Sequence, residues 1–288
     1  MAHADNQVQL EPAERAAGDT THFWRVPRYD GLECLRARFR RYSYARHTHD
    51  TYAIAVILRG CETFFYRGVQ HYAGAGSVAV VCPDELHDGA PYADEFEYRS
   101  FYVTANLMRE IAEDLVGRPL PHPPWFRHAV FHDPDLAASL SGLHASLDTR
   151  TGAASLIEQD IRLIEFLSKL ICRWADLGER PPVRRESRAV SKAREYLDAH
   201  FSEDIELADL VRLTGLSRSY FISAFRRETG LAPHAYLLDR RFRAAKRLLA
   251  QGDSPADVAA ACGFFDQSHL HRVFKARMGV TPGTYRAA

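Results

Sequence analysis

The last third of the chain contains an internal repeat, which restricts its fold more than any other feature of the sequence. Gly215-Leu216 recurs 48 residues later as Gly263-Phe264, and the segment 230–233 (GLAP) recurs 49 residues later as 279–282 (GVTP). Each copy predicts a helix, a turn containing glycine and a second helix, which is the helix-turn-helix unit. Similarity at a fixed period usually reflects a duplicated unit. We therefore predict an all-α domain over residues 188–288 with two helix-turn-helix units.

The second helix of each unit separates apolar from polar side chains. Phe221 and Phe225, like Leu270 and Phe274, lie four residues apart and so face inward together. The outward positions carry hydrogen-bonding and basic groups, which suit base edges in the major groove and backbone phosphates. The alternative is an ordinary helical bundle with charged faces, and the duplication argues against it. We predict double-stranded promoter DNA as a partner, contacted by Arg218, Ser219, Ser223, Arg226, Gln267, Ser268, His271, Arg272 and Lys275.

The net charge of zero hides an uneven distribution of charge. Up to residue 179 there are 18 basic and 25 acidic residues, a balance of −7, whereas the remainder has 19 and 12, a balance of +7. Such asymmetry is typical of a chain with one nucleic-acid-binding end. The change falls at residues 179–187, where Pro181 and Pro182 stand in a charged stretch that disfavours helix. We predict a linker there.

The part before this linker changes character once. Over residues 32–103, short runs rich in β-branched and aromatic residues alternate with turns that contain glycine or proline, which predicts a sandwich or barrel within residues 1–104. Residues 105–178 are predicted to be mainly helical. Within them, one helix face carries Leu156, Leu163, Leu167, Leu170 and Trp174. This face either packs on the β domain or forms the seam of a homodimer, and both alternatives stay open.

The motifs of the repeat are specific enough to suggest a family. Residues 263–286 read GFFDQSHLHRVFKARMGVTPGTYR, and residues 216–221 read LSRSYF. These motifs resemble those of AraC/XylS-family transcription regulators over about residues 190–286. The resemblance implies DNA binding through both second helices at adjacent half-sites, and contact with RNA polymerase. Ile222 holds an outward position that is often polar in this family, so we expect no base contact from it.

The β region resembles the cupin-like sensor domain of the same family. The resemblance rests on residues 44–52 (YARHTHDTY), on glycines 60, 68 and 76, and on residues 83–87 (PDELH). It implies a small-molecule effector bound inside the barrel. We predict that the effector contacts His47, His49, Tyr52, Glu62, Tyr66, His87, Tyr98 and Tyr102.

The three histidines of this set could also form an open metal site. Metal-binding cupins have a carboxylate four residues after the second histidine, and Ala53 stands there in this chain. Glu62 is no substitute, because we expect Gly60 to end the strand before it. We therefore favour a pocket lined by histidines and predict no metal and no cofactor.

Several classes of protein are disfavoured by what the sequence lacks. The five cysteines are far apart without any CxxC, which argues against a disulfide framework and a zinc cluster. No apolar run approaches the ~20 residues of a membrane helix, and the first residues do not resemble a secretory signal. We expect a cytoplasmic, non-enzymatic regulator of α+β multidomain fold: a cupin-like β-barrel with a helical dimerisation segment, then the all-α domain. A cupin-type metalloenzyme with a helical appendage and an effector-independent DNA-binding regulator are the alternatives.

Overall fold

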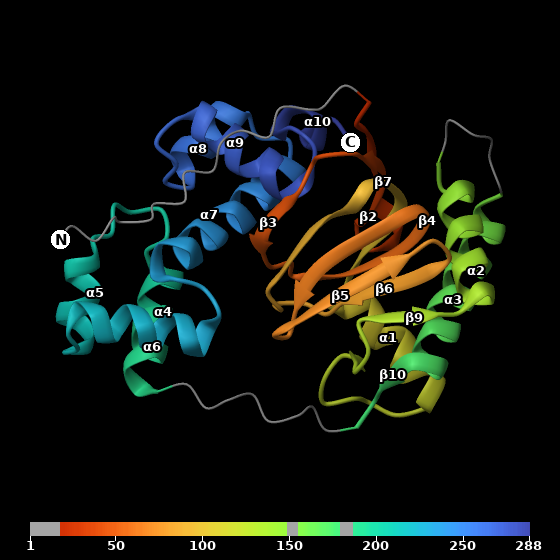
Figure 1. Cartoon of the computed structure of the whole chain (residues 1–288), viewed down its shortest axis with the longest axis horizontal. Helices are drawn as coiled ribbons and strands as arrows, with labels where there is room; N and C mark the ends of the chain where they lie inside the picture. Colours follow the sequence, from red (N-terminus) through yellow and green to blue (C-terminus); the bar gives the residue numbers. More distant parts are fainter. Residues whose placement is uncertain (1–17, 149–154, 179–186) are drawn as a thin grey trace.

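A computed structural model describes residues 18–148, 155–178 and 187–288, so the predicted N-terminal arm and almost all of the predicted linker lie outside it. The described chain forms one curled antiparallel sheet between two groups of helices (Figure 1). The strand order is β1-β2-β7-β4-β6-β9, with β3 also paired to β7 and β5 to β4. The strands are β1 (Thr20–Val26), β2 (Leu32–Phe39), β3 (Tyr44–His47), β4 (Thr51–Tyr66), β5 (Val69–Gly74), β6 (Ser77–Val81), β7 (His87–Thr104) and β9 (Val130–His132).

The two faces of the sheet bury different side chains. Along β2, Leu35, Ala37 and Phe39 enter the core inside the curled sheet, while Leu32 and Cys34 enter the core on its outer face. This alternation follows from the two-residue period of a strand. Both faces are thus covered, and the inner face surrounds a barrel-like interior.

Gly60 does not end a strand, contrary to the prediction. Strand β4 continues through it to Tyr66, and its pairing with β7 shifts register on both sides of it. The φ of Gly60 is +70°, and a Cβ there would lie 1.9 Å from the carbonyl oxygen of Glu95. Glycine is therefore required for a bulge that bends a long strand, and this bend helps to curl the sheet. As a result, Glu62 lies on β4 itself.

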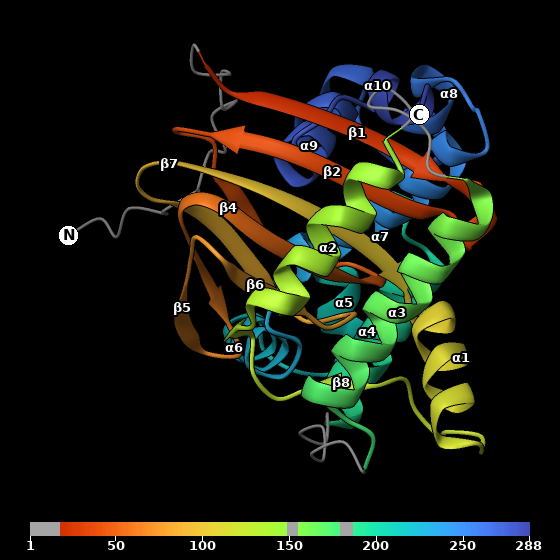
Figure 2. The same cartoon turned by 90° about the vertical axis from the view of Figure 1, so that its right-hand side faces the viewer.

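Helices α1 (Ala105–Val116), α2 (Pro134–Ser146) and α3 (Leu156–Trp174) cover the outer face of the sheet (Figure 2). Leu163, Leu167 and Leu170 of α3 are buried against it, so the predicted apolar face packs on the β domain. Leu156, at the start of that face, is 66% exposed. The short strands β8 (Trp125–Phe126) and β10 (Ala175–Asp176) pair with each other beside these helices.

The predicted pair of helix-turn-helix units is confirmed. The helices are α4 (Arg188–Ala199), α5 (Leu207–Thr214), α6 (Arg218–Thr229), α7 (Pro233–Ala250), α8 (Pro255–Ala261), α9 (Gln267–Met278) and α10 (Pro282–Arg286). Ser217 and Asp266 cap the second helix of each unit with their side chains, and Gly215 and Gly263 adopt φ values of +70° and +74° in the turns. No helix among the described residues is long and apolar enough to cross a membrane.

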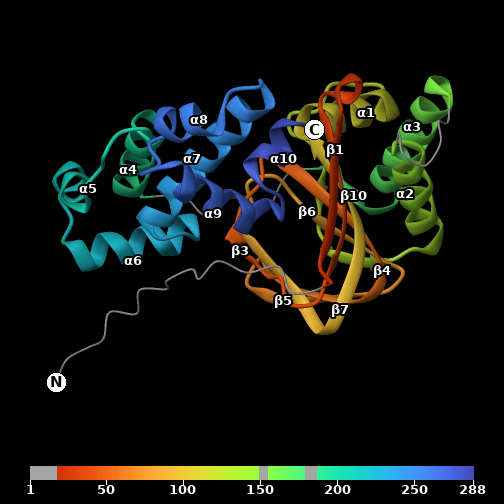
Figure 3. The same cartoon turned by 90° about the horizontal axis from the view of Figure 1, so that it is seen from above.

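The two helix-turn-helix units pack into different hydrophobic cores. Phe221 and Phe225 belong to a small core formed by the first unit itself. Phe274 and Tyr285 of the second unit belong instead to the core that fills the barrel, where α9 and α10 lie against the sheet (Figure 3). We call the contact of α7, α9 and α10 with the β domain the joint. Its polar members are Glu33, Thr48 and Asp84 of the β domain and Asp239, Arg243, Lys246, Arg277 and Tyr285 of the helices.

Candidate nucleic-acid interface and ligand cavity

Helices α6 and α9 expose most of the side chains predicted to contact DNA. Phe221, Phe225, Leu270 and Phe274 are fully buried on the opposite face, so the amphipathic pattern places the polar residues outward, although Ile222 is also exposed there. Lys275 is half-buried, and its backbone carbonyl accepts a hydrogen bond from the hydroxyl of Tyr42. Ser219 lies in α6, but its side chain is outside the described part of the structure. The exposed residues are Arg218, Ser223, Arg226, Gln267, Ser268, His271 and Arg272.

The exposed arginines of this surface are available to phosphates. Within the described residues, no carboxylate forms an ion pair with Arg218, Arg226 or Arg272. By contrast, Arg212 of α5 pairs with Asp209 at 3.4 Å. Arginines without an ionic partner on two duplicated helices can bind the phosphates of the DNA backbone and the edges of guanine bases.

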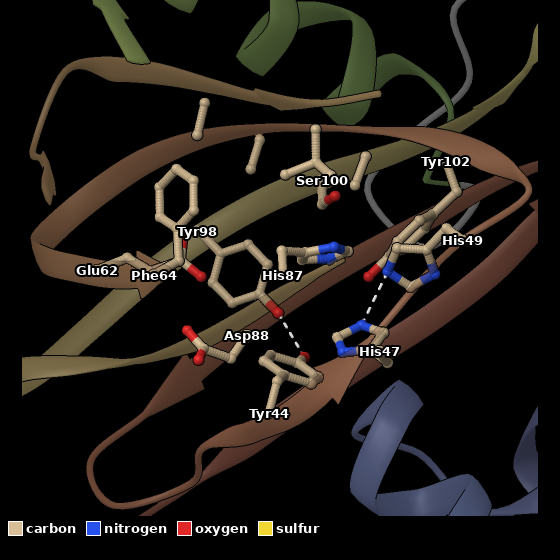
Figure 4. Close-up of a pocket in the computed structure, with 14 residues that line it drawn as sticks. Tyr44, His47, His49, Glu62, Phe64, His87, Asp88, Tyr98, Ser100 and Tyr102 are labelled. Carbon is tan, nitrogen blue, oxygen red and sulfur yellow. Dashed lines mark hydrogen bonds between the residues drawn. The ribbon is translucent and has the colours of Figure 1, made fainter. Parts of the chain in front are cut away.

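The interior of the barrel contains a cavity of about 60 Å³ (Figure 4). Six of the predicted effector contacts line it, namely His47, His49, Glu62, His87, Tyr98 and Tyr102. The sequence analysis missed the other lining residues, which are Tyr44, Ala53, Ala55, Phe64, Ala79, Val81, Asp88 and Ser100. Most of them alternate along β4, β6 and β7, so the strand period indicates their face once the register is known.

Tyr52 and Tyr66 do not line the cavity, contrary to the prediction. Tyr52 points to the outer face of the sheet, because Ala53 takes the inward position, and its hydroxyl donates to the carbonyl of Pro124. Tyr66 shares the inner face but lies at the end of β4, where its hydroxyl donates to the carboxylate of Glu85.

The three histidines gather at the end of the cavity next to the joint. His47 and His49 flank Thr48 at the end of β3, and His87 begins β7; they are 2%, 5% and 7% exposed. The Nε2 atoms of His47 and His49 are 3.0 Å apart. Burial, as the largest cause, lowers the pKa of all three rings from the ordinary value, which keeps them neutral.

Hydrogen bonds to the backbone orient two of these rings. Nδ1 of His47 lies 2.6 Å from the carbonyl oxygen of Ala45, and Nδ1 of His87 lies 3.0 Å from that of Glu85. A neutral imidazole beside a carbonyl must donate, so these Nδ1 atoms carry the protons. The Nε2 atoms of His47 and His87 are then lone-pair donors.

The other end of the cavity contains two carboxyl groups, those of Glu62 and of Asp88, and Asp88 pairs with Arg46 at 3.4 Å. Burial raises the pKa of Glu62 to about 8, so its carboxyl group holds a proton at pH 7. Between the two ends, the hydroxyl groups of Tyr44 and Tyr98 are 2.6 Å apart. The cavity therefore offers mostly neutral donors and acceptors beside the carboxylate of Asp88, which suit a small polar ligand or an ion.

The joint contains a buried network centred on Asp239. Its carboxylate, 3% exposed, accepts hydrogen bonds from Thr48 at 2.8 Å, from Nε of Arg243 at 2.9 Å and from Arg277 at 2.7 Å. Arg243 also pairs with Asp84 at 2.5 Å. The ion pairs of Asp239 lie within the helical domain, and Thr48 and Asp84, whose side chain is 72% exposed, connect this network to the β domain.

A second buried pair in the joint joins Lys246 of α7 to Glu33 of β2 at 2.8 Å, and the hydroxyl of Tyr285 donates to the same carboxylate. The sequence analysis missed this contact and the Asp239 network. The sequence did contain an indication of these contacts: Asp239 and Lys246 are charged residues on the helix face that also buries Phe242.

Comparison with known proteins agrees with this arrangement. Residues 31–167 match the family model of the AraC-like ligand binding domain, and residues 210–288 match that of a helix-turn-helix domain. YbfI, an HTH-type transcriptional regulator of Bacillus subtilis (strain 168), is 29% identical over 244 residues, which cover 83% of this chain and 86% of that protein. The HTH-type transcriptional activator RhaS of Escherichia coli (strain SE11) is 23% identical over 263 residues, which cover 88% and 91%.

The solved structure of ToxT from Vibrio cholerae has the same overall fold. It covers 89% of this chain and 98% of its own, with a TM-score of 0.51 and 14% identity. The ligand-binding and helix-turn-helix parts thus occur in the same chain and the same order as in transcriptional regulators. This protein belongs to the AraC/XylS family and is a DNA-binding transcriptional regulator with an N-terminal ligand-binding domain.

Proposed function

We propose that the protein changes the transcription of its target genes when a small ligand enters the barrel cavity. The observation that carries this proposal is that a single residue, Tyr44, both lines the cavity and lies beside Gly279, the residue that caps α9. Tyr44 lines the cavity, and its hydroxyl would lie 3.1 Å from a Cβ placed on Gly279, at the end of α9. A ligand that displaces Tyr44 therefore moves α9 relative to the barrel.

We propose that α6 and α9 enter successive major grooves at adjacent half-sites of a promoter. The exposed and unpaired Arg218 and Arg272 support this, one on each helix, and the 18-residue helix α7 links the two units. Bound in this way, the protein activates transcription by contacting RNA polymerase. In vitro transcription with purified polymerase, with and without the protein, tests this last step.

DNA binding is tested by selecting duplexes from a random library with the full chain. Fluorescence anisotropy at a fixed salt concentration then gives the Kd of the enriched duplex for each variant. Arg218→Ala and Arg272→Ala should each weaken binding, whereas Arg212→Ala, an exposed arginine of α5 that pairs within its own helix, should leave it unchanged. Failure to enrich any duplex, or equal effects of all three substitutions, would contradict the proposal.

Ligand control is tested with a library of metabolites and ions. Those that raise the melting temperature of the full chain are added to the anisotropy and transcription assays. We propose that the cavity serves binding and not turnover, which the regulatory relatives support. Equal DNA binding and equal transcription with every compound and with none would favour an effector-independent regulator.

We propose that two copies associate through the outward face of α3. Ile161 and Ile164 of this face are 50% and 55% exposed, although the opposite face of the helix is buried. Light scattering should show a homodimer, and the double substitution Ile161→Glu and Ile164→Glu should give a monomer. A wild-type monomer at micromolar concentration would contradict this. Because its partner is promoter DNA, we place the protein in the cytoplasm.

A further inference from the structure

We propose that His47, His49 and His87 bind a divalent transition metal ion, with Zn²⁺ as the reference ion, and that its occupancy sets the rigidity of the joint. This names the ligand of the sensing cavity and therefore rests on the proposed function. All three side chains are buried, and one possible ligand nitrogen from each lies within 4.8 Å of the others. Three imidazoles with a free fourth position form a common open zinc site.

The orientation of the rings fits metal binding. His47 and His87 both donate their Nδ1 protons to backbone carbonyls, which directs the Nε2 lone pairs away from the backbone. Such a hydrogen bond on the far nitrogen accompanies nearly all histidine ligands, since it fixes the tautomer and the ring orientation. His49 approaches His47 through its Nε2, and to bind a metal through this atom its ring would carry its proton on Nδ1 instead.

The spacing of the nitrogens also fits. Zinc–nitrogen bonds of about 2.0–2.1 Å at tetrahedral angles place the ligand nitrogens about 3.3 Å apart. The Nε2 atoms of His47 and His49 are 3.0 Å apart, and the whole set lies within 4.8 Å. We expect the three nitrogens to move closer to this spacing around the ion.

The size of the cavity favours an ion over an organic effector. Pockets for organic ligands usually enclose about 300–1,000 Å³, whereas this cavity encloses about 60 Å³, which is room for a few water molecules. A volume of this size suits an ion with one or two waters, or with a small anion in its fourth position. Ala53 and Ala55 contribute only small side chains to the lining.

The cations of the joint do not exclude a metal ion, because acids neutralise them. Arg243 and Arg277 both bind the carboxylate of Asp239, and Arg243 also binds that of Asp84. Lys246 pairs with Glu33. Asp88 also lines the cavity, and its carboxylate pairs with Arg46 at 3.4 Å.

The metal site and the joint share one short segment of backbone. His47 and His49 point into the cavity (Figure 4), whereas Thr48 between them donates its hydroxyl proton to Asp239 of α7 at 2.8 Å. An ion held by both histidines immobilises the residue between them and thereby strengthens its bond to α7. Zinc binding should therefore restrict the motion of α7, which links the two helix-turn-helix units.

The test begins with calorimetric titration of ZnCl₂ into the untagged full chain after removal of metals with a chelator. Wild type and His128→Ala, which replaces an exposed histidine of the same domain, should bind one zinc per chain. His47→Ala and His87→Gln should bind it at least 100-fold more weakly, and circular dichroism should show that both fold. No zinc binding by wild type, or unchanged affinity in folded His87→Gln, would overturn the site.

Coupling is tested by hydrogen exchange of the α7 amides with and without zinc. Zinc should slow their exchange in wild type, and Thr48→Val should still bind one zinc but lose the slowing. Unchanged exchange in zinc-loaded wild type would overturn the coupling. The selection of DNA duplexes distinguishes the two proposals: selection without zinc binding overturns the metal site alone, and zinc binding without selection overturns the proposed function.

Discussion

Replacing Asp239 with asparagine removes the one carboxylate at the centre of the joint. The new side chain has nearly the same size, but it leaves the guanidinium of Arg277, which is 6% exposed, without its ionic partner. Removing one member of a buried ion pair costs about 3–5 kcal/mol, because the remaining charge stays out of water. We expect Asp239→Asn to lower the free energy of unfolding by that amount.

Urea denaturation of the full chain, followed by circular dichroism, measures this loss. Asp253→Asn, an exposed aspartate between α7 and α8, is the matched control and should change stability by less than about 0.5 kcal/mol. Combining Asp239→Asn with Arg277→Met removes the stranded charge and should recover part of the loss, since contacting residues are not additive. A loss below about 1 kcal/mol, or strict additivity in the double variant, would refute the reasoning.

Three further predictions concern the DNA surface, the cavity and the sheet. Arg272→Ala should weaken binding of the selected duplex by about 1–3 kcal/mol and relax the preference at one base position; an unchanged Kd and preference would exclude Arg272 as a base contact. Burial raises the pKa of Glu62 from 4.5 to about 8, so the folded chain retains a proton that the unfolded chain releases. The free energy of unfolding contributed by this group therefore falls as the pH rises from about 4.5 to about 8. Glu62→Gln should remove that fall and exceed wild type by about 2–4 kcal/mol at pH 8, as urea denaturation across this range will show; parallel pH profiles would contradict it. Gly60→Ala should destabilise by about 2–4 kcal/mol, because its Cβ meets the carbonyl of Glu95, whereas Gly68→Ala, also at positive φ but in open space, should cost about 1–2 kcal/mol. Equal thermal shifts for the two variants would argue against the close approach.

Helices α6 and α9 could be predicted because the residues that mark their ends act locally. Gly215 and Ser217 mark the end of one helix and the start of the next within three residues, and the duplication repeats the same signals at Gly263 and Asp266. A capping side chain and a left-handed glycine act on neighbouring backbone groups, so their meaning does not depend on the rest of the fold.

The strands of the sheet were less predictable, because the same residue type can play different structural roles in a strand. A glycine at positive φ can end a strand or form a bulge, and at Gly60 only the partner strand β7 decides between them. Tyr52 was misplaced for a related reason. Whether it or Ala53 faces inward depends on the register after the histidine segment, which sequence alone does not set.

The joint was beyond sequence analysis because it forms between distant parts of the chain. Thr48 and Asp239 are 191 residues apart, and Glu33 and Tyr285 are 252 apart. A buried acid on an amphipathic helix indicates a polar contact, but not the partner that makes it. The cavity was predictable to the extent that its residues lie on one face of neighbouring strands.

The unequal attachment of the two helix-turn-helix units has an evolutionary consequence. The first unit packs Phe221 and Phe225 in a core of its own, so substitutions that alter α6 are absorbed within that unit. The second unit shares its core with the barrel, so a change in α9 that disturbs Phe274 also disturbs the sensor. If α6 and α9 each bind one half-site as proposed, related proteins should acquire new DNA sequence preferences at the half-site of α6 more readily than at that of α9.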